Sequence, residues 1–165
     1  MYLHPAGNAA CSLLISEHHG TWSVGAPVED TISALHLITH GIPSRYPRMK
    51  ILNSHLGGAL PMLIQRMDSQ LPWEAPKTPE KPSVAARRIV VRLLRPRPAA
   101  RAARPIRSAP TALVLGTDFP YETGAVFERA VSYITTAAWP RRRRPRALGD
   151  RRGALQLAGS VTSLS

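Results

Sequence analysis

Short apolar segments alternate with longer segments of helical periodicity over residues 1–138 of the chain. Each short segment carries apolar side chains and ends in polar ones, a pattern typical of a buried strand. We predict strands in residues 1–6, 49–55 and 113–120 and helices in residues 29–41, 56–71 and 122–138. Strands separated by helices pair in parallel through βαβ crossovers, so the pattern predicts an α/β fold.

Apolar side chains recur at helical spacing within the predicted helices. Residues 29–41 begin with acidic residues, which complement the helix dipole, and end at Gly41, a suitable C-cap. The predicted apolar faces are Ile32, Leu35, Leu37 and Ile38 in this helix and Leu60, Leu63, Ile64 and Met67 in the next. Residues 7–27 contain glycine and mixed side chains, which indicates a loop or an active-site lid. Residues 72–83 carry four prolines and predict another loop.

Positive charge is concentrated in two arginine-rich segments. The net charge is +12, yet residues 84–112 hold eight Arg and no acid, and residues 139–165 hold seven Arg and one acid. Dense proline breaks helices and strands alike, so both segments are predicted to be irregular. They are either disordered basic segments or GC-rich DNA translated in a shifted frame, whose codons give Arg, Pro, Ala and Gly. We favour the shifted frame, because the first segment interrupts a βα pattern that resumes at Ala112.

The remaining composition limits the compartment and the partners. The one cysteine, Cys11, cannot form an internal disulfide, which favours a cytoplasmic protein. Cys11 is either a nucleophile or a buried thiol, and its apolar neighbours favour the buried thiol. No apolar run approaches the roughly 18 residues of a membrane helix, so no membrane partner is expected. A basic nucleic-acid-binding protein is an alternative function. Nucleic acid is a disfavoured partner, because residues 84–112 contain no aromatic side chain to stack on bases.

Three motifs place a chemically active side chain at the end of a predicted strand. They are Leu3-His4-Pro5, Ser54-His55-Leu56-Gly57-Gly58-Ala59-Leu60-Pro61 and Gly116-Thr117-Asp118-Phe119-Pro120. Taken singly, a histidine at a strand end is more often structural, and an aspartate after Gly-Thr is more often a turn or a helix cap. Parallel strands, however, bring their carboxyl ends to one edge, where α/β proteins place their sites. The shared position of His4, His55 and Asp118 therefore predicts a functional site.

In this order the motifs resemble the amidohydrolase superfamily, in the branch related to 2-amino-3-carboxymuconate-6-semialdehyde decarboxylase and γ-resorcylate decarboxylase. The resemblance extends over residues 1–88 and 112–137. It implies a (β/α)8 barrel that binds a divalent metal, most often Zn²⁺, with Mn²⁺ or Mg²⁺ as alternatives. By the matching motif positions, His4 and Asp118 are metal ligands, and His55 is the catalytic residue that exchanges a proton.

The resemblance also implies the chemistry and the partner. Members of the family decarboxylate small aromatic or enoic carboxylic acids or hydrolyse related bonds, so a small-molecule carboxylate is the expected substrate. An ion held by imidazole and carboxylate acidifies water at its open position. A neighbouring imidazole can then exchange that proton near neutral pH. A second copy of the chain, in a homo-oligomer, is considered as a further partner.

The sequence departs from the family pattern in three respects. It contains no HxH motif, which supplies the other metal ligands in the family. Residues 84–112 stand where another strand is expected, and residues 139–165 replace the last helices. A complete barrel needs about 250 residues, so we expect the C-terminal half of a TIM barrel in residues 1–138, followed by a disordered basic tail. We expect such a fragment to be inactive alone; whether the chain is an enzyme stays open, and a non-functional remnant is a further alternative.

Overall fold

The computed structural model describes residues 1–93, 113–118, 121 and 123–136. Most of the first arginine-rich segment, residues 94–112, and the whole basic tail predicted for residues 139–165 lie outside them. The interpretations of those segments, including the nucleic-acid alternative, therefore stay predictions. Within the described part of the chain, no helix has the length and apolarity that crossing a membrane requires.

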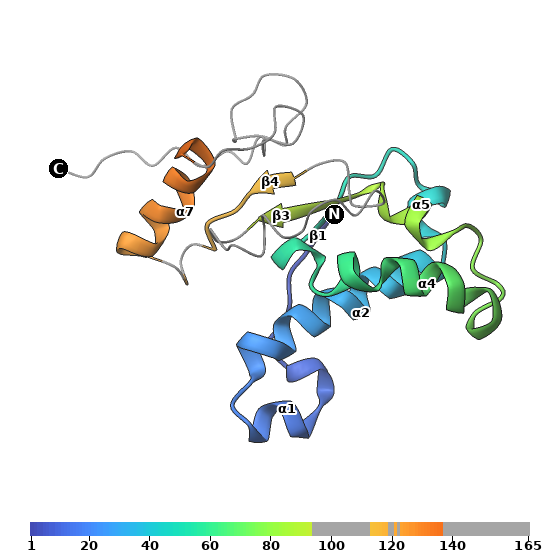
Figure 1. Cartoon of the computed structure of the whole chain (residues 1–165), viewed down its shortest axis with the longest axis horizontal. Coiled ribbons are helices and arrows are strands. Elements are labelled where there is room, and N and C mark those ends of the chain that lie inside the picture. Colours follow the sequence, from blue (N-terminus) through green and yellow to red (C-terminus); the bar gives the residue numbers. More distant parts are fainter. Residues whose placement is uncertain (94–112, 119–120, 122, 137–165) are drawn as a thin grey trace.

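Four parallel strands form one sheet (Figure 1). In order along the sheet they are β1 (Tyr2–Leu3), β2 (Ile51–Asn53), β3 (Ile89–Leu93) and β4 (Leu113–Leu115). The register pairs Leu3 with Asn53 and Asn53 with Val91, so the carboxyl ends of these neighbouring strands meet at one edge. Helices occupy the crossovers from β1 to β2 and from β2 to β3. The predicted α/β class is confirmed.

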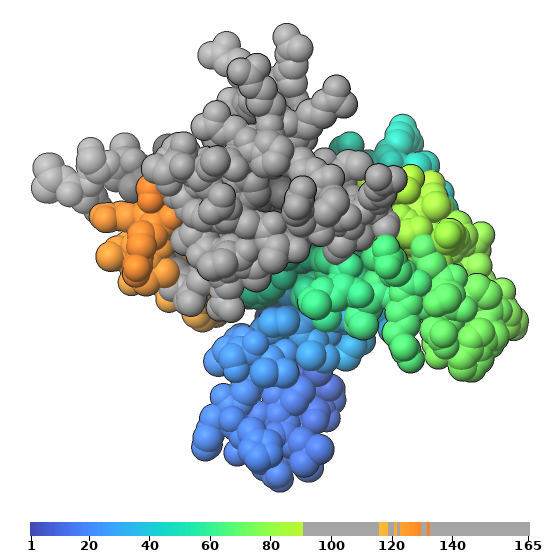
Figure 2. Space-filling view, viewed as in Figure 1, coloured from blue at the N-terminus to red at the C-terminus, as the bar shows by residue number. Residues whose placement is uncertain are grey.

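Helices and helical turns lie between these strands and after them along the chain. The helices are α1 (Leu13–Glu17), α2 (Ala26–Thr39), α3 (Ile42–Arg45), α4 (Leu60–Glu74), α5 (Pro82–Ala86) and α7 (Gly124–Thr136), and the short turns are η1 (Ala9–Cys11), η2 (Thr21–Gly25) and η3 (His55–Gly57). The predicted loop or lid at residues 7–27 thus contains η1, α1 and η2. Figure 2 shows this part, in blue, as a lobe that projects from the remainder. Cys11 is exposed on the lobe rather than buried, whereas Ala9 of the same turn is buried.

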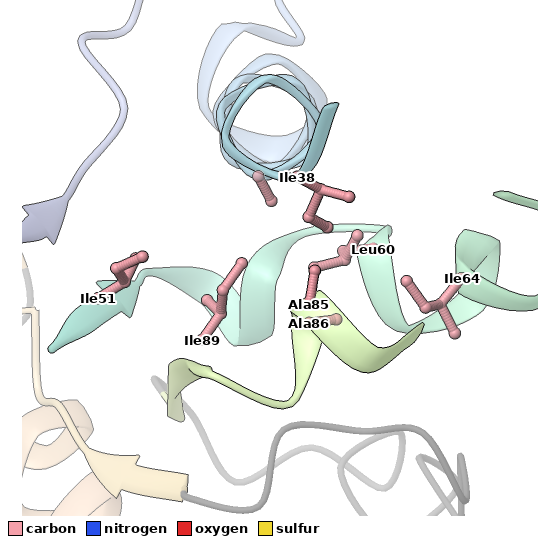
Figure 3. Packing of buried hydrophobic residues seen from close by; sticks show 8 residues of the cluster. Ile38, Ile51, Leu60, Ile64, Ala85, Ala86 and Ile89 are labelled. Atoms are coloured by element: carbon pink, nitrogen blue, oxygen red, sulfur yellow. The ribbon is translucent and has the colours of Figure 1, made fainter. Parts of the chain in front are cut away.

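The core lies between the sheet and helices α2, α4 and α5 (Figure 3). Its buried residues are Ala34, Ile38, Ile51, Leu60, Ile64, Ala85, Ala86 and Ile89. The alanines allow the helices to approach closely, and the isoleucines fill the space between helices and strands. This packing holds α2 against the end of β2, where Asn53 Nδ2 donates a hydrogen bond of 3.1 Å to the Asp30 carbonyl.

The apolar face predicted for α2 is only partly right. The buried residues of this helix are Ala26, Asp30, Ala34 and Ile38, each four positions after the last. The predicted residues Ile32 and Leu35 are exposed. Residues four apart share one side of a helix, so the small alanines and Asp30 define the packed side, and larger apolar residues point outward.

The irregular structure predicted for residues 84–112 is wrong for residues 84–93. There α5 ends at Ala86, and β3 begins at Ile89, which is fully buried and pairs with Ile51 of β2. The run of β-branched residues that starts at Ile89 favours a strand and outweighs the arginines around it. The strand expected between the second helix and Ala112 is therefore present.

The loop predicted for residues 72–83 is shorter in the structure. Helix α4 continues through Pro72 to Glu74, and α5 begins at Pro82. A proline lacks the backbone N–H, so near the end of a helix it removes only one hydrogen bond, and at the start of a helix it removes none.

Candidate metal centre

His4, His55 and Asp118 lie together at the carboxyl ends of the strands. His4 follows β1, His55 lies two residues after β2, and Asp118 lies three residues after β4. One potential metal-ligand atom from each side chain lies within 4.8 Å of the other two. The structure thus brings the three predicted residues to one place, while the roles assigned to them stay predictions.

The sheet curves to bring these side chains together. β1 and β4 are its outer strands, three strand spacings apart, which is roughly 14 Å in a flat sheet. Nevertheless, Nε2 of His4 lies 3.5 Å from Oδ1 of Asp118. Curvature of this kind is what closes parallel strands into barrels, and it places both outer strand ends around one point.

The contact between His4 and Asp118 joins an imidazole nitrogen and a carboxylate oxygen. Nδ1 of His4 lies 3.0 Å from the Pro5 carbonyl oxygen, which can only accept, so Nδ1 carries the ring proton. If the ring holds only that proton, Nε2 directs its lone pair at the Asp118 carboxylate, 3.5 Å away. This contact is favourable only if a second ring proton or a cation lies between the two. Two ligand atoms of one tetrahedral zinc ion are roughly 3.3 Å apart, so the observed spacing fits a shared metal ion.

His55 is held by a buried carboxylate. Its Nδ1 lies 2.6 Å from Oδ2 of Asp30, whose side chain is 1% exposed, whereas that of His55 is 18% exposed. The centroids of the His4 and His55 rings are 5.7 Å apart, with the rings tilted by 58°. One nitrogen of His55 is therefore tied to α2, while its ring lies beside that of His4.

The backbone of the site adopts conformations that most residues avoid. The angle φ is +43° at His55, +60° at Leu56 and +61° at Asp118. A left-handed conformation costs a non-glycine residue roughly 1–2 kcal/mol, so surrounding contacts have to hold it. Strain of this kind concentrates at functional sites, where it fixes a side chain in one direction.

Glu29 organises the loop that follows His4. Its carboxylate oxygens accept hydrogen bonds from the backbone N–H groups of Ala6 at 2.8 Å, Asn8 at 3.0 Å and Ala10 at 3.4 Å. A carboxylate with three backbone donors is well satisfied and orders the segment that supplies them. Helix α2 therefore anchors the chain immediately beyond the first candidate ligand.

Replacement of Glu29 by glutamine is expected to loosen this loop. Glutamine is neutral and keeps one acceptor oxygen, so all three N–H groups lose a charged partner, and either Ala6 or the pair Asn8 and Ala10 loses its acceptor. Hydrogen exchange at the affected amides is expected to accelerate by roughly tenfold or more. Exchange followed by NMR measures this, with Glu74→Gln, an exposed glutamate of α4, as the control. Unchanged exchange at all three amides would show that Glu29 does not hold the loop.

Three residues that support the site are missing from the sequence prediction: Glu29, Asp30 and Ser54. The helix dipole already accounts for acids at a helix start, so nothing in the sequence suggested other partners for Glu29 and Asp30. Ser54 Oγ donates to the Leu3 carbonyl at 2.9 Å and so joins β2 to β1. No sequence signal marked Asp30 either, because only the structure shows that the side of α2 that it shares with Ala34 is buried. A buried carboxylate needs a partner.

The chain is similar to several known decarboxylases, although no protein-family model matches it. γ-Resorcylate decarboxylase from Polaromonas sp. (strain JS666) is 33% identical over 87 residues, which cover 48% of this chain and 26% of that protein. 5-Carboxyvanillate decarboxylase from Sphingomonas paucimobilis has a TM-score of 0.65 at 27% identity, over 84% of this chain and 43% of its own. Dihydroxybenzoic acid decarboxylase from Polaromonas sp. JS666 was solved with manganese and the inhibitor 2-nitroresorcinol. Its TM-score is 0.65 at 22% identity, and the match covers 85% of this chain and 44% of that protein.

These relatives are decarboxylases of the amidohydrolase superfamily, which confirms the resemblance predicted from the sequence. The chain spans about a quarter of the curated relative and less than half of each solved structure. What the whole relatives do is therefore a basis for proposals about this chain.

Proposed function

We propose that this chain carries part of the active site of a metal-dependent decarboxylase that acts on an aromatic carboxylic acid, within a (β/α) barrel. One observation carries the proposal: Nε2 of His4 and a carboxylate oxygen of Asp118 lie 3.5 Å apart, a spacing that suits two ligands of one cation. The curved parallel sheet and the decarboxylases among the relatives support the same reading.

His4 and Asp118 would hold the ion in this proposal. Zn²⁺ is the ion expected from the sequence resemblance, whereas the manganese in the Polaromonas structure favours Mn²⁺. Imidazole and carboxylate suit either ion. A divalent ion bound there would supply Lewis-acid stabilisation of negative charge on an oxygen of the acid.

His55 would move the proton that the reaction requires. Decarboxylation breaks the bond between a ring carbon and the carboxyl carbon, and the electron pair stays on the ring carbon until a proton joins it. An imidazole is suited to this transfer near neutral pH. Because Nδ1 of His55 is occupied by Asp30, Nε2 is the nitrogen that would hold and deliver this proton.

The coordination sphere limits what the chain would do unaided. With His55 assigned to proton transfer, His4 and Asp118 provide two protein ligands, whereas catalytic zinc sites commonly use three. We therefore propose that metal and substrate bind weakly and that turnover requires further ligands. The cytoplasmic location and the homo-oligomer likewise stay predictions.

Metal-dependent binding of an aromatic acid tests the proposed function. Calorimetry with 2,6-dihydroxybenzoate is expected to detect binding to the full chain with Mn²⁺ present and a loss of at least roughly tenfold in affinity after metal chelation. His4→Ala is expected to abolish the metal effect, and His36→Ala, at an exposed histidine of α2, to preserve it. Equal binding with and without metal would contradict the proposal, and release of CO2 would establish turnover.

A further inference from the structure

Asp30 is a buried acid that neither the sequence motifs nor the proposed metal set includes. Its side chain is 1% exposed, on the packed side of α2. Removing a carboxylate from water is costly unless hydrogen bonds replace those to water. The partner it has is Nδ1 of His55, 2.6 Å from Oδ2, so this acid is buried where it meets the candidate catalytic imidazole.

The chain holds this contact from both sides. The Asp30 carbonyl accepts a hydrogen bond of 3.1 Å from Nδ2 of Asn53, which is fully buried at the end of β2. Two residues later the same segment supplies His55. The backbone and the side chain of Asp30 are thus both hydrogen-bonded to β2 and the turn that follows it. These two bonds fix the separation between α2 and that turn.

A carboxylate on Nδ1 determines which nitrogen of His55 carries the proton. An ionised carboxylate can only accept, so the neutral imidazole has its hydrogen on Nδ1 and its lone pair on Nε2. His4 has the same tautomer for a different reason, since its Nδ1 donates to the Pro5 carbonyl. Both rings therefore keep Nε2 without the ring proton; Nε2 of His4 lies beside Asp118, and the His55 ring lies beside the His4 ring.

The strained turn that carries His55 has to be held in place by a contact such as the one with Asp30. His55 and Leu56 have φ of +43° and +60°, conformations that side-chain-bearing residues rarely adopt. A short, charge-assisted hydrogen bond to a rigid helix resists relaxation of this turn. Asp30 consequently controls the orientation of the ring as well as its tautomer.

We infer that Asp30 is a positioning residue that holds His55 with Nδ1 protonated and Nε2 directed into the site. The functional importance of this inference rests on the proposed proton-transfer role of His55. The inference itself concerns only the tautomer and orientation of that imidazole. Loss of Asp30 would leave the His4–Asp118 pair in place and release His55 to the other tautomer.

Imidazole nitrogen shifts of the full-length chain test this role directly. Long-range ¹H–¹⁵N spectra are recorded without metal or substrate, at an alkaline pH where the imidazoles are neutral, and His55 is assigned by its absence in His55→Gln. The wild-type chain is expected to show a protonated Nδ1 and an unprotonated Nε2. In Asp30→Asn, whose amide is a weaker acceptor, the ratio of this tautomer to the other is expected to fall by roughly tenfold.

The matched control is Asp68→Asn. The side chain of Asp68 is likewise hydrogen-bonded, accepting from the backbone N–H of Ser83 at 2.8 Å, but it lies on α4 away from the three site residues. Its change is therefore expected to leave the tautomer of His55 unaltered. An Nε2-protonated His55 in the wild-type chain would overturn the inference even if Asp30→Asn does not fold. An unchanged tautomer ratio in folded Asp30→Asn would overturn it as well. Because no metal is added, a chain that fails to bind metal would refute the proposed function and leave this result intact.

Discussion

Replacement of Asp118 by asparagine is expected to weaken the binding of Mn²⁺ or Zn²⁺ by roughly 100-fold or more. Loss of a group that merely supports a metal ligand costs 10- to 100-fold in affinity, so removing the charge of a ligand itself should cost at least the upper value. The change is conservative in shape. Asparagine also tolerates the left-handed backbone at this position, where φ is +61°, better than other residues do.

Competition with a metal-binding dye measures this loss of affinity. Asp68→Asn makes the same change at a carboxylate of α4 and is expected to bind the ion as the wild-type chain does. His4→Ala is expected to show a loss comparable to that of Asp118→Asn, because both residues contact the same ion in this account. Wild-type affinity in Asp118→Asn would show that its carboxylate is not a ligand.

Gly58→Ala is expected to destabilise the protein by about 3 kcal/mol, by combining backbone strain with a clash. Gly58 has φ of +62°. A Cβ there would lie 2.0 Å from the Pro27 carbonyl oxygen and 2.5 Å from Oγ1 of Thr31. The carbonyl belongs to the backbone of α2 and cannot move without shifting the helix, so η3 and α2 must separate and carry His55 away from Asp30.

Denaturant unfolding followed by circular dichroism measures this loss of stability. Gly20→Ala is the matched control, because Gly20 has φ of −91° and its added Cβ would come no closer than 3.3 Å to its neighbours. That variant is expected to change the free energy of unfolding by less than about 1 kcal/mol. Similar stability in the two variants would mean that α2 and η3 do not pack as closely as described.

The sequence was sufficient to predict the strands that end in the site. β1, β2 and β4 fall within the predicted ranges, because short apolar runs bounded by polar residues and glycine leave few alternatives. Their shared direction follows from the helices between them, and it places His4, His55 and Asp118 at one edge. The motif positions thus identified residues that the structure brings within 4.8 Å of one another.

Other features depend on packing that local sequence does not reveal. β3 was missed because arginines and prolines surround Ile89, and only pairing with β2 makes the run a buried strand. Asp30 resembled an ordinary acid at a helix start until the small residue Ala34 proved to lie on the buried side of α2. The curvature that joins His4 to Asp118 is a property of the whole sheet, which no single segment encodes.

Anomalous diffraction from crystals of the full-length chain grown with Mn²⁺ tests most directly whether His4 and Asp118 share an ion. The account predicts one anomalous peak within bonding distance of Nε2 of His4 and a carboxylate oxygen of Asp118, with His55 beside it. A peak only elsewhere, for example at the exposed pair His36 and His40, or no peak at all with His4 directly hydrogen-bonded to Asp118, would contradict it.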